Sequence, residues 1–384
     1  MRNVYNFSLR AWLLSLLCLL VGGSAAADEV RYPIPTDDYI TVDDVTLVPG
    51  SSKLYKVVIN LHGSRIYTAY QMDIQFPPGV DVKVTNDFPA ISICDGEDGI
   101  YPINEDTEKS LHSIDASYGK VGSKILRLAC HGSNNAELTA NSGRLLFFKV
   151  KVSPYLKPGD VTLKVTNLDF ITKENAQEYS CKDQTLTLHA EAQSTVSVSV
   201  SGDSHYSTCV LPFAVDKLPD GVKAYSARRM DDTGSYVLLD EAQSLAAYTP
   251  YILYADHGYS GTLSGPVDAS LYQEVASDGY LRGAIVAQQQ SQGYVLQDQG
   301  DGAKFYAMGG TAFNIPEGKC WLQTDAPQAA PALGIQVGGT TTAITGPTAA
   351  TPTTPIYTLD GVRVSEMQPG RIYVVAGHKV LKLK

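Results

Sequence analysis

The residues that could perform chemistry are isolated in this sequence and form no recognised catalytic motif. His131 follows Cys130 and precedes Gly132 and Ser133, an arrangement that could belong to a nucleophile site. No GxSxG elbow, HExxH helix or glycine-rich phosphate loop accompanies it. A turn after a strand is therefore the better interpretation of this histidine. The seven histidines show no metal-ligand spacing, and the sequence predicts no metal site and no catalytic residue.

Acidic residues cluster in turns. The stretch 95–99, DGEDG, offers carboxylate oxygens of the kind that calcium binds, but it lacks the EF-hand spacing. We interpret it as a solvated loop, with calcium as the alternative. Three adjacent pairs could be mistaken for acid/base pairs, although neighbouring side chains on a strand point to opposite faces. These pairs are Asp37-Asp38, Asp43-Asp44 and Asp231-Asp232.

Aromatic side chains are the better candidates for ligand contact. Tyr67 and Tyr70 flank the start of an alternating strand, and Tyr101 and Tyr118 lie in predicted loops. The planar face of a tyrosine can stack on a sugar ring. The alternative is that these tyrosines pack in the core or at a strand edge. No cofactor is predicted.

Cysteine use suggests two disulfides. Five cysteines follow the predicted leader, without CxxC spacing, so zinc is not indicated. Cys94 and Cys130 are one candidate pair, and Cys209 and Cys320 are the other. Cys181 would then be unpaired. The alternative is five free thiols, because sequence does not determine connectivity.

The element around which the chain is organised is a strand over residues 70–76. Tyr70, Met72, Ile74 and Phe76 alternate with polar residues, which predicts a strand with one buried face. The run Pro77-Pro78-Gly79 ends it, since proline donates no ladder hydrogen bond.

Similar alternating runs, separated by turn residues, fill the chain to residue 200. They are residues 54–61, 125–130, 145–152, 161–165 and 196–200. No convincing 3.6-residue period occurs there. This pattern predicts an all-β sandwich over residues 28–200.

Three segments of this region resemble cohesin-like jelly-roll modules, which occur in cellulosomal scaffolds and in many secreted bacterial proteins. DVTLVPGSSKLYKVVINL resembles the opening strand, Pro-Gly turn and second strand, and YQMDIQFPPGVDV resembles the strand that ends in a proline turn. GRLLFFKVKVSPYLKPGDVTLKVTNLDF resembles the closing strand pair. The partner-contact positions of that family do not map onto this sequence, so the resemblance implies no dockerin partner.

A second β-rich domain is predicted over residues 201–337, after a boundary at residues 201–203. Its strands are expected over residues 206–213, 222–227, 236–239, 250–254, 294–296, 305–306 and 319–322. Hairpin turns are expected at Asp220-Gly221, Asp278-Gly279 and Asp301-Gly302. STCVLPFAVDKLPDGVKAY, AYTPYIL and AFNIPEGKCWL resemble a module found near the C-termini of secreted Bacteroidales proteins.

The C-terminal part divides into a linker and a tail. Residues 338–355 are rich in threonine, proline and glycine, which predicts a linker. Residues 356–384 predict two hairpins, turning at Asp360-Gly361 and around Gly377-His378. This tail resembles the C-terminal sorting tails of Bacteroidetes proteins exported by the type IX system, which implies an extracellular destination, either secreted or at the outer cell surface.

The N-terminus has the pattern of a signal peptide. Arg2 and Arg10 precede or flank an apolar run that is too short to span a bilayer, and small residues before Asp28 predict cleavage after Ala27. Leu17 before Cys18 argues against a lipoprotein. Loss of two arginines changes the net charge from −10 to −12, which disfavours nucleic-acid binding. No membrane span is predicted in the mature chain.

Two function classes remain. The first is a non-catalytic, exported binding or adhesion protein that recognises a glycan or a protein through a sandwich face or its loops. The alternative is a secreted glycan hydrolase whose carboxylate pair comes from distant loops. The lack of local catalytic motifs favours the first, and we expect no enzyme activity.

Overall fold

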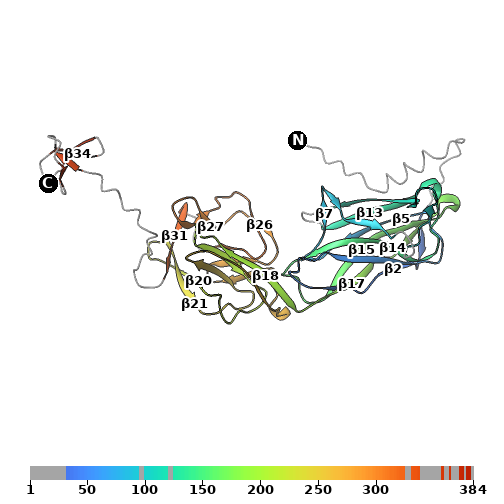
Figure 1. The fold of residues 1–384 in the computed structure, drawn as a ribbon, viewed down its shortest axis with the longest axis horizontal. Coiled ribbons are helices and arrows are strands. Elements are labelled where there is room, and N and C mark those ends of the chain that lie inside the picture. The colour runs from blue at the N-terminus through green and yellow to red at the C-terminus, as the bar shows by residue number, and fades with distance from the viewer. Residues whose placement is uncertain are drawn as a thin grey trace.

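The structure is a computed structural model of the 384-residue chain. It describes residues 32–94, 99–119, 124–324 and 330–337, and four short strands between residues 356 and 381. The elements in these ranges are strands and three single 3-10 turns, at Ser133–Asn135, Glu174–Ala176 and Ala269–Leu271. The fold is all-β (Figure 1). In these ranges no helix has the length and apolar character needed to cross a membrane.

The first region is a β-sandwich with small accessory hairpins. Its strands are β1 (Ile34–Thr36), β2 (Tyr39–Val42), β3 (Thr46–Leu47), β4 (Tyr55–His62), β5 (Ala69–Gln75), β6 (Val80–Val82), β7 (Val84–Thr85), β8 (Phe88–Pro89), β9 (Ile91–Ile93), β10 (Ile103–Asn104), β11 (Lys109–Ser110), β12 (His112–Tyr118), β13 (Ile125–Gly132), β14 (Ser142–Val152), β15 (Gly159–Ile171), β16 (Glu178–Cys181) and β17 (Gln184–Ala190).

Two sheets form the layers of this sandwich. The eight-stranded sheet has the order β1-β16-β15-β5-β13-β12, with β17 beside β15 and β3 beside β17. The five-stranded sheet has the order β2-β4-β14-β6, with β9 also beside β14. Apolar side chains from both sheets make one core. In strands such as β17, every second residue is buried, as the pleat requires.

The predicted central strand is confirmed. β5 lies between β13 and β15, and Tyr70, Met72, Ile74 and Phe76 are all buried in the core. Asp73 and Gln75 lie on the outer face, where Asp73 accepts hydrogen bonds from Arg127 and Asn167. The alternation in the sequence therefore identified both the strand and its buried face.

The predicted closing strand pair is wrong. β14 and β15 belong to different sheets, β14 pairing with β4 and β15 pairing with β5 and β17. The loop 153–158 crosses from one layer to the other. Both strands alternate as expected, but alternation does not specify the partner of a strand.

The second region is a ten-stranded sheet with two accessory pairs. Its strands are β18 (Gln193–Val200), β19 (Tyr206–Val210), β20 (Val222–Met230), β21 (Tyr236–Ala242), β22 (Pro250–Ala255), β23 (Tyr259–Pro266), β24 (Val275–Asp278), β25 (Leu281–Ala284), β26 (Gln288–Gln290), β27 (Tyr294–Asp298), β28 (Ala303–Ala307), β29 (Phe313–Ile315), β30 (Cys320–Leu322) and β31 (Ala332–Val337). The large sheet has the order β19-β22-β20-β21-β31-β28-β27-β30-β25-β24. β19 also contacts β25 and β30, so the sheet curls back on itself.

Strand β18 corrects the predicted domain boundary. We expected residues 196–200 to close the first sandwich, but β18 pairs along its whole length with β23. Val196, Val198 and Val200 are buried in a core of the second region. The change from one core to the next therefore falls at Glu191-Ala192, about ten residues earlier than expected.

Two of the three predicted hairpin turns are confirmed. Asp278-Gly279 connects β24 to β25, and Asp301-Gly302 lies between β27 and β28. Gly279 and Gly302 have φ of +55° and +90°, the left-handed conformation that favours glycine. Asp220-Gly221 makes no hairpin, because β19 before it pairs with β22 rather than with β20.

The C-terminal strands form one small sheet. β32 (Ile356–Thr358) pairs with β33 (Arg363–Val364), and β34 (Ile372–Val375) pairs with β35 (His378–Leu381), as the two predicted hairpins require. β32 also pairs with β34, which joins the hairpins. The two predicted turns, the leader 1–27 and the linker 338–355 lie outside the described residues.

Candidate functional site

Three of the four predicted ligand-binding tyrosines are core residues. Tyr67, Tyr70 and Tyr101 are 0%, 1% and 4% exposed. A ring buried to this degree offers no face to a sugar, so the prediction is wrong for these three. Phe170 occupies the face of Tyr67, at 4.6 Å between ring centres.

The phenol oxygens of these tyrosines bind inside the protein. Tyr67 donates a hydrogen bond to Asp38, and the Tyr70 and Tyr101 hydroxyls lie 2.7 Å apart. Burial raises the pKa of all three phenols. Tyr118 is half-buried, packs edge-on against Phe76 and donates to Asp81 at 2.9 Å. It ends β12 rather than lying in the predicted loop, and these contacts hold its ring edge and its hydroxyl within the protein.

The predicted disulfides are absent. None of the five described cysteines is disulfide-bonded, and only Cys181 is partly exposed. Burial raises the pKa of Cys130 and of Cys209 to about 12. The Cys320 sulfur lies 3.2 Å from the Cys209 carbonyl oxygen rather than bonded to its sulfur. Buried, protonated thiols of this kind behave as small apolar groups.

The other residues that could perform chemistry, the acidic pairs and His131, do not come together in one site. Asp37 is exposed beside Lys182, whereas Asp38 is buried and accepts hydrogen bonds from the Ser64 amide and Tyr67. His131 lies within β13 rather than in a turn, with its ring 3.1 Å from the Ser113 hydroxyl. Residues 95–98 lie outside the described ranges. Among the described residues, no three His, Cys, Asp or Glu side chains gather as a metal site would require.

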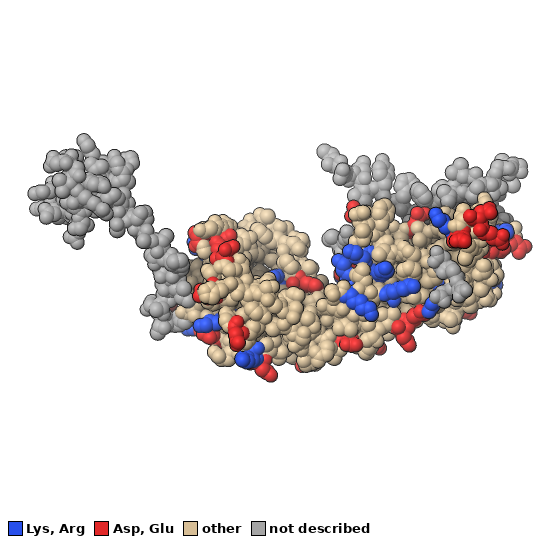
Figure 2. Space-filling model, in the orientation of Figure 1, with Lys and Arg blue, Asp and Glu red and all other residues tan. Residues whose placement is uncertain are grey.

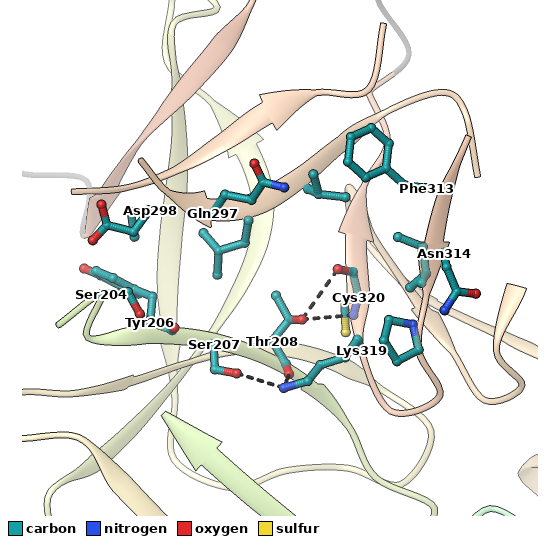
Figure 3. A pocket seen from close by; sticks show the side chains of 15 residues that line it. Ser204, Tyr206, Ser207, Thr208, Gln297, Asp298, Phe313, Asn314, Lys319 and Cys320 are labelled. Atoms are coloured by element: carbon teal, nitrogen blue, oxygen red, sulfur yellow. Dashed lines mark hydrogen bonds between the residues drawn. The ribbon is translucent and has the colours of Figure 1, made fainter. Parts of the chain in front are cut away.

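The candidate site is a pocket in the second region that the sequence did not predict. It has a volume of about 350 Å³ and lies between β19, β27, β29 and β30 (Figure 3). It is lined by Ser204, Tyr206, Ser207, Thr208, Val295, Leu296, Gln297, Asp298, Ala303, Phe313, Asn314, Ile315, Pro316, Lys319 and Cys320.

Lys319 and Thr208 fix one wall of this pocket. The Lys319 ammonium donates to the Ser207 hydroxyl at 3.0 Å and to the Thr208 carbonyl at 3.3 Å. The Thr208 hydroxyl accepts from the Cys320 amide at 3.0 Å and donates to the Cys320 carbonyl at 3.5 Å. These bonds tie the open edge of β19 to β30, so this wall is rigid.

The opposite wall carries polar groups that are only partly used. Gln297 accepts from Gln299 at 3.2 Å, and Asn314 accepts from Gln289 at 3.4 Å. Asp298 accepts from the Gly300 amide through one carboxylate oxygen. The amide N–H groups of Gln297 and Asn314 have no acceptor among the described residues. These groups can therefore bind a ligand.

The pocket combines an aromatic ring with hydroxyl, amide, ammonium and carboxylate groups. Phe313 is half-buried at its rim, and Tyr206 packs against Tyr254 at 5.0 Å between ring centres. Burial, followed by the nearby Tyr254, raises the pKa of the Tyr206 phenol. Asp298 is the only acidic residue among the lining residues. The arrangement can hold a polar ligand but provides no carboxylate pair.

No signal in the sequence identified this pocket. Its residues come from five stretches between 204 and 320, each with ordinary strand composition. Two segments that contain lining residues stand out in the sequence for their resemblance alone: STCVLPFAVDKLPDGVKAY, with Ser207 and Thr208, and AFNIPEGKCWL, with Phe313, Asn314 and Lys319. A pocket assembled by the curling of a sheet leaves no local pattern.

A second cavity lies where the two regions meet. It has a volume of about 300 Å³, and Gly50, Pro154 and Tyr155 face Thr195 and Glu317 across it. Tyr155 donates to the Val210 carbonyl at 2.8 Å, and Ser153 donates to Glu317 at 2.8 Å. Neighbouring protein atoms exclude water from part of the Glu317 carboxyl, and this raises its pKa. Hydrogen bonds thus join the two regions.

Part of the chain is similar in fold to solved structures of other proteins. No family model and no curated protein matches the sequence. A non-cellulosomal cohesin of the archaeon Archaeoglobus fulgidus is 11% identical, over 41% of this chain and 92% of that one, with a TM-score of 0.28. A chain of a cohesin–dockerin complex from Clostridium thermocellum is 13% identical, over 41% of this chain and all (100%) of that one, with a TM-score of 0.29. A cohesin of Clostridium acetobutylicum is 15% identical, over 39% and 90%, with a TM-score of 0.27.

Proposed function

We propose that the chain is a non-catalytic binding protein that holds a short glycan in the pocket between β19, β27, β29 and β30. The observation that supports this most is the unused amide N–H group of Gln297 in the same pocket as the Phe313 ring. Sugars present hydroxyls that accept such hydrogen bonds and C–H faces that pack on aromatic rings.

The pocket also suits binding better than hydrolysis. A glycosidase places two carboxylates about 5–10 Å apart across the scissile bond. Asp298 has no second acid beside it among the lining residues. Lys319 is held by two hydrogen bonds and lies on the β19 side of the pocket, so it can orient a ligand oxygen. The hydrolase alternative therefore has less support from this site.

Glycan binding to the mature chain, residues 28–384, tests the proposal. A glycan array identifies a ligand, and isothermal titration calorimetry measures its affinity. Gln297→Ala removes a hydrogen bond of about 1 kcal/mol net, so it should weaken binding about fivefold. Phe313→Ala should weaken it further, because it removes the apolar platform.

Matched variants distinguish the pocket from the rest of the surface. Gln243→Ala removes an exposed glutamine outside the pocket, and Phe88→Ala removes a ring that is 73% exposed on the first sandwich. Both should bind like the unmodified protein. Loss of binding in these controls alone would place the site elsewhere. Ligand turnover that disappears in Asp298→Asn would overturn the non-catalytic assignment in favour of the hydrolase.

We further propose that the protein acts at the outer cell surface. The support is the leader-like pattern of residues 1–27 and the sorting-like tail 356–384. N-terminal sequencing of the exported protein should begin at Asp28. Removal of the tail should change the location of the protein while the glycan affinity of the purified chain stays the same.

A further inference from the structure

The outer face of the five-stranded sheet carries a block of four lysines, which we call the lysine face. Lys56 lies on β4, Lys149 and Lys151 lie on β14, and Lys83 follows β6. Lys149 is directly opposite Lys56 in the strand register. The Lys83 amide donates to the Lys149 carbonyl at 2.8 Å, which places Lys83 on the other side of Lys149. Three lysines thus form a row across three strands.

This row is electrostatically unfavourable for the isolated protein. Like charges directly opposite each other destabilise a sheet. Within the described part of the chain, none of the four lysines forms an ion pair. Asp81 is opposite Lys151 in the register, but it accepts from Lys124 and Tyr118 instead. Figure 2 shows basic side chains gathered on one face of the first sandwich, on a chain of net charge −10.

An apolar floor adjoins the lysine row. Phe147 precedes Lys149 by two residues on the same face, and it is half-buried. Its strand partner is the buried Val58. The Lys56 ammonium lies 4.1 Å from the centre of the Phe147 ring. A partner on this face would therefore meet positive charge and an apolar surface together.

We infer that the lysine face binds an acidic polysaccharide. The positive charge favours a polyanion, and the Phe147 ring, whose face is covered by the Lys56 ammonium, holds that charge in place by a cation–π contact. Lysine is depleted from the cores of protein–protein interfaces, which argues against a protein partner. Arg144 lies on the same sheet face, opposite Asn60, but Asp43 holds it at 3.1 Å, so its guanidinium is already used and the four lysines provide only point charges. Its flat shape and row of point charges suit an extended polymer with repeated anionic groups.

This inference is independent of the glycan pocket. The lysine face lies on the first sandwich, and the pocket lies in the second region. Variants of Gln297 or Asn314 should therefore leave polyanion binding unchanged. In the same way, loss of the lysines should leave binding in the pocket unchanged.

The experiment measures binding of the mature chain to polygalacturonate, dextran sulfate and neutral dextran. Both polyanions should bind, neutral dextran should not, and binding should weaken when salt is raised from about 0.05 M to about 0.3 M. Lys56→Gln, Lys149→Gln and Lys151→Gln combined should lower the polyanion affinity about tenfold or more. The three corresponding lysine-to-arginine changes should retain it.

The control replaces Lys182, Lys217 and Lys223, which are exposed elsewhere, with glutamine. This variant has the same net charge as the first but should bind normally. Equal loss in both triple variants would show a net-charge effect and overturn the site. Tighter lysine-dependent binding to polyglutamate or to oligothymidylate would overturn the ligand class in favour of an acidic protein or a nucleic acid.

Discussion

Tyrosine hydroxyls connect the buried interior of the first sandwich to its polar residues. Tyr67 reaches Asp38, and Tyr70 reaches Tyr101 inside the core. Tyr118 extends to Asp81 nearer the surface. A phenylalanine would fill the same space but would leave these polar partners without a hydrogen bond, at a cost of about 1–3 kcal/mol when the partner is buried. The excess of tyrosine over phenylalanine, 23 against 9, fits this use.

His112 should make the stability of the first sandwich depend on pH. It is 5% exposed, and its Nε2 lies 3.2 Å from the Thr68 carbonyl. Burial lowers its pKa from 6.5 to about 4. The unfolded chain therefore binds a proton at pH values where the folded protein does not. The contribution of neutral His112 to the free energy of unfolding is complete above pH 6.5 and is lost as the pH falls towards 4.

The prediction compares the unmodified protein with His112→Gln. Between pH 7 and pH 5, the unmodified protein should lose about 2 kcal/mol more unfolding free energy than the variant. Denaturant titrations followed by tyrosine near-UV circular dichroism measure this difference. An identical pH dependence in the two proteins would contradict the assignment.

For single residues, the sequence predicts whether a side chain is buried only within regular strands. The alternation of Tyr70 with Gln71 predicts that Tyr70 is buried, which conflicts with the prediction that it contacts a ligand. Tyr67 and Tyr101 lie outside the strands, where no period indicates which way a side chain points. Tyr67 is buried against Phe170 and Asp38, and Tyr101 against Tyr70 and His112, all of them outside its own segment of the sequence. The pocket residues were unpredictable for the same reason.

Strands β18 and β23 show that the sequence can predict one strand of a pair and miss the other. Alternation predicted β18 but not its partner, and β23 was missed because its segment, YSGTLSGP, contains glycines and a terminal proline. These glycines make room for aromatic side chains. An added Cβ would lie 2.3 Å from the Tyr259 hydroxyl at Gly261 and 2.8 Å from the Phe213 ring at Gly265. The feature that reads as a strand breaker is here a packing requirement.

Removal of β18 should destabilise the second region. Fragment 192–337 retains the β18–β23 pair, whereas fragment 201–337 lacks it and loses three buried valines. Burial of a valine is worth about 1.5–3 kcal/mol, so the shorter fragment should be less stable by about 5 kcal/mol. Urea unfolding followed by the fluorescence of Trp321, the only tryptophan in either fragment, reports the difference. Equal urea midpoints for the two fragments would support a domain boundary at residue 201.

The two regions are joined by a side chain as well as by the chain itself. Tyr155 comes from the loop between β14 and β15 of the first sandwich, yet it is buried in a core of the second region. An added Cβ at Gly318 would lie 2.2 Å from its hydroxyl, so glycine is required there. Gly50, with φ of +76°, similarly allows the Thr195 carbonyl to approach.

Tyr155→Phe should therefore destabilise the neighbouring region rather than only its own. It removes the hydrogen bond to Val210, which should cost about 1–3 kcal/mol. The midpoint of the Trp321 fluorescence transition should fall accordingly in the mature chain. Tyr118→Phe, which removes the hydroxyl bound to Asp81, is the matched control and should leave that transition unchanged. A shift in both variants would indicate a general effect of hydroxyl loss.

The link between the regions also determines how the molecule responds to tension. Only Glu191 and Ala192 separate β17 from β18, a reach of about 7 Å. The Glu191 amide donates to Leu47 of the first sandwich, and the Ala192 carbonyl accepts from Val267 of the second region. A force that pulls the regions apart is therefore borne by this short stretch of backbone together with the bonds that Tyr155 and Ser153 make to Val210 and Glu317. Once those side-chain bonds part, we expect β18 to peel from β23 one bond pair at a time, beginning at Gln193, so the second region should loosen while the first sandwich keeps its shape.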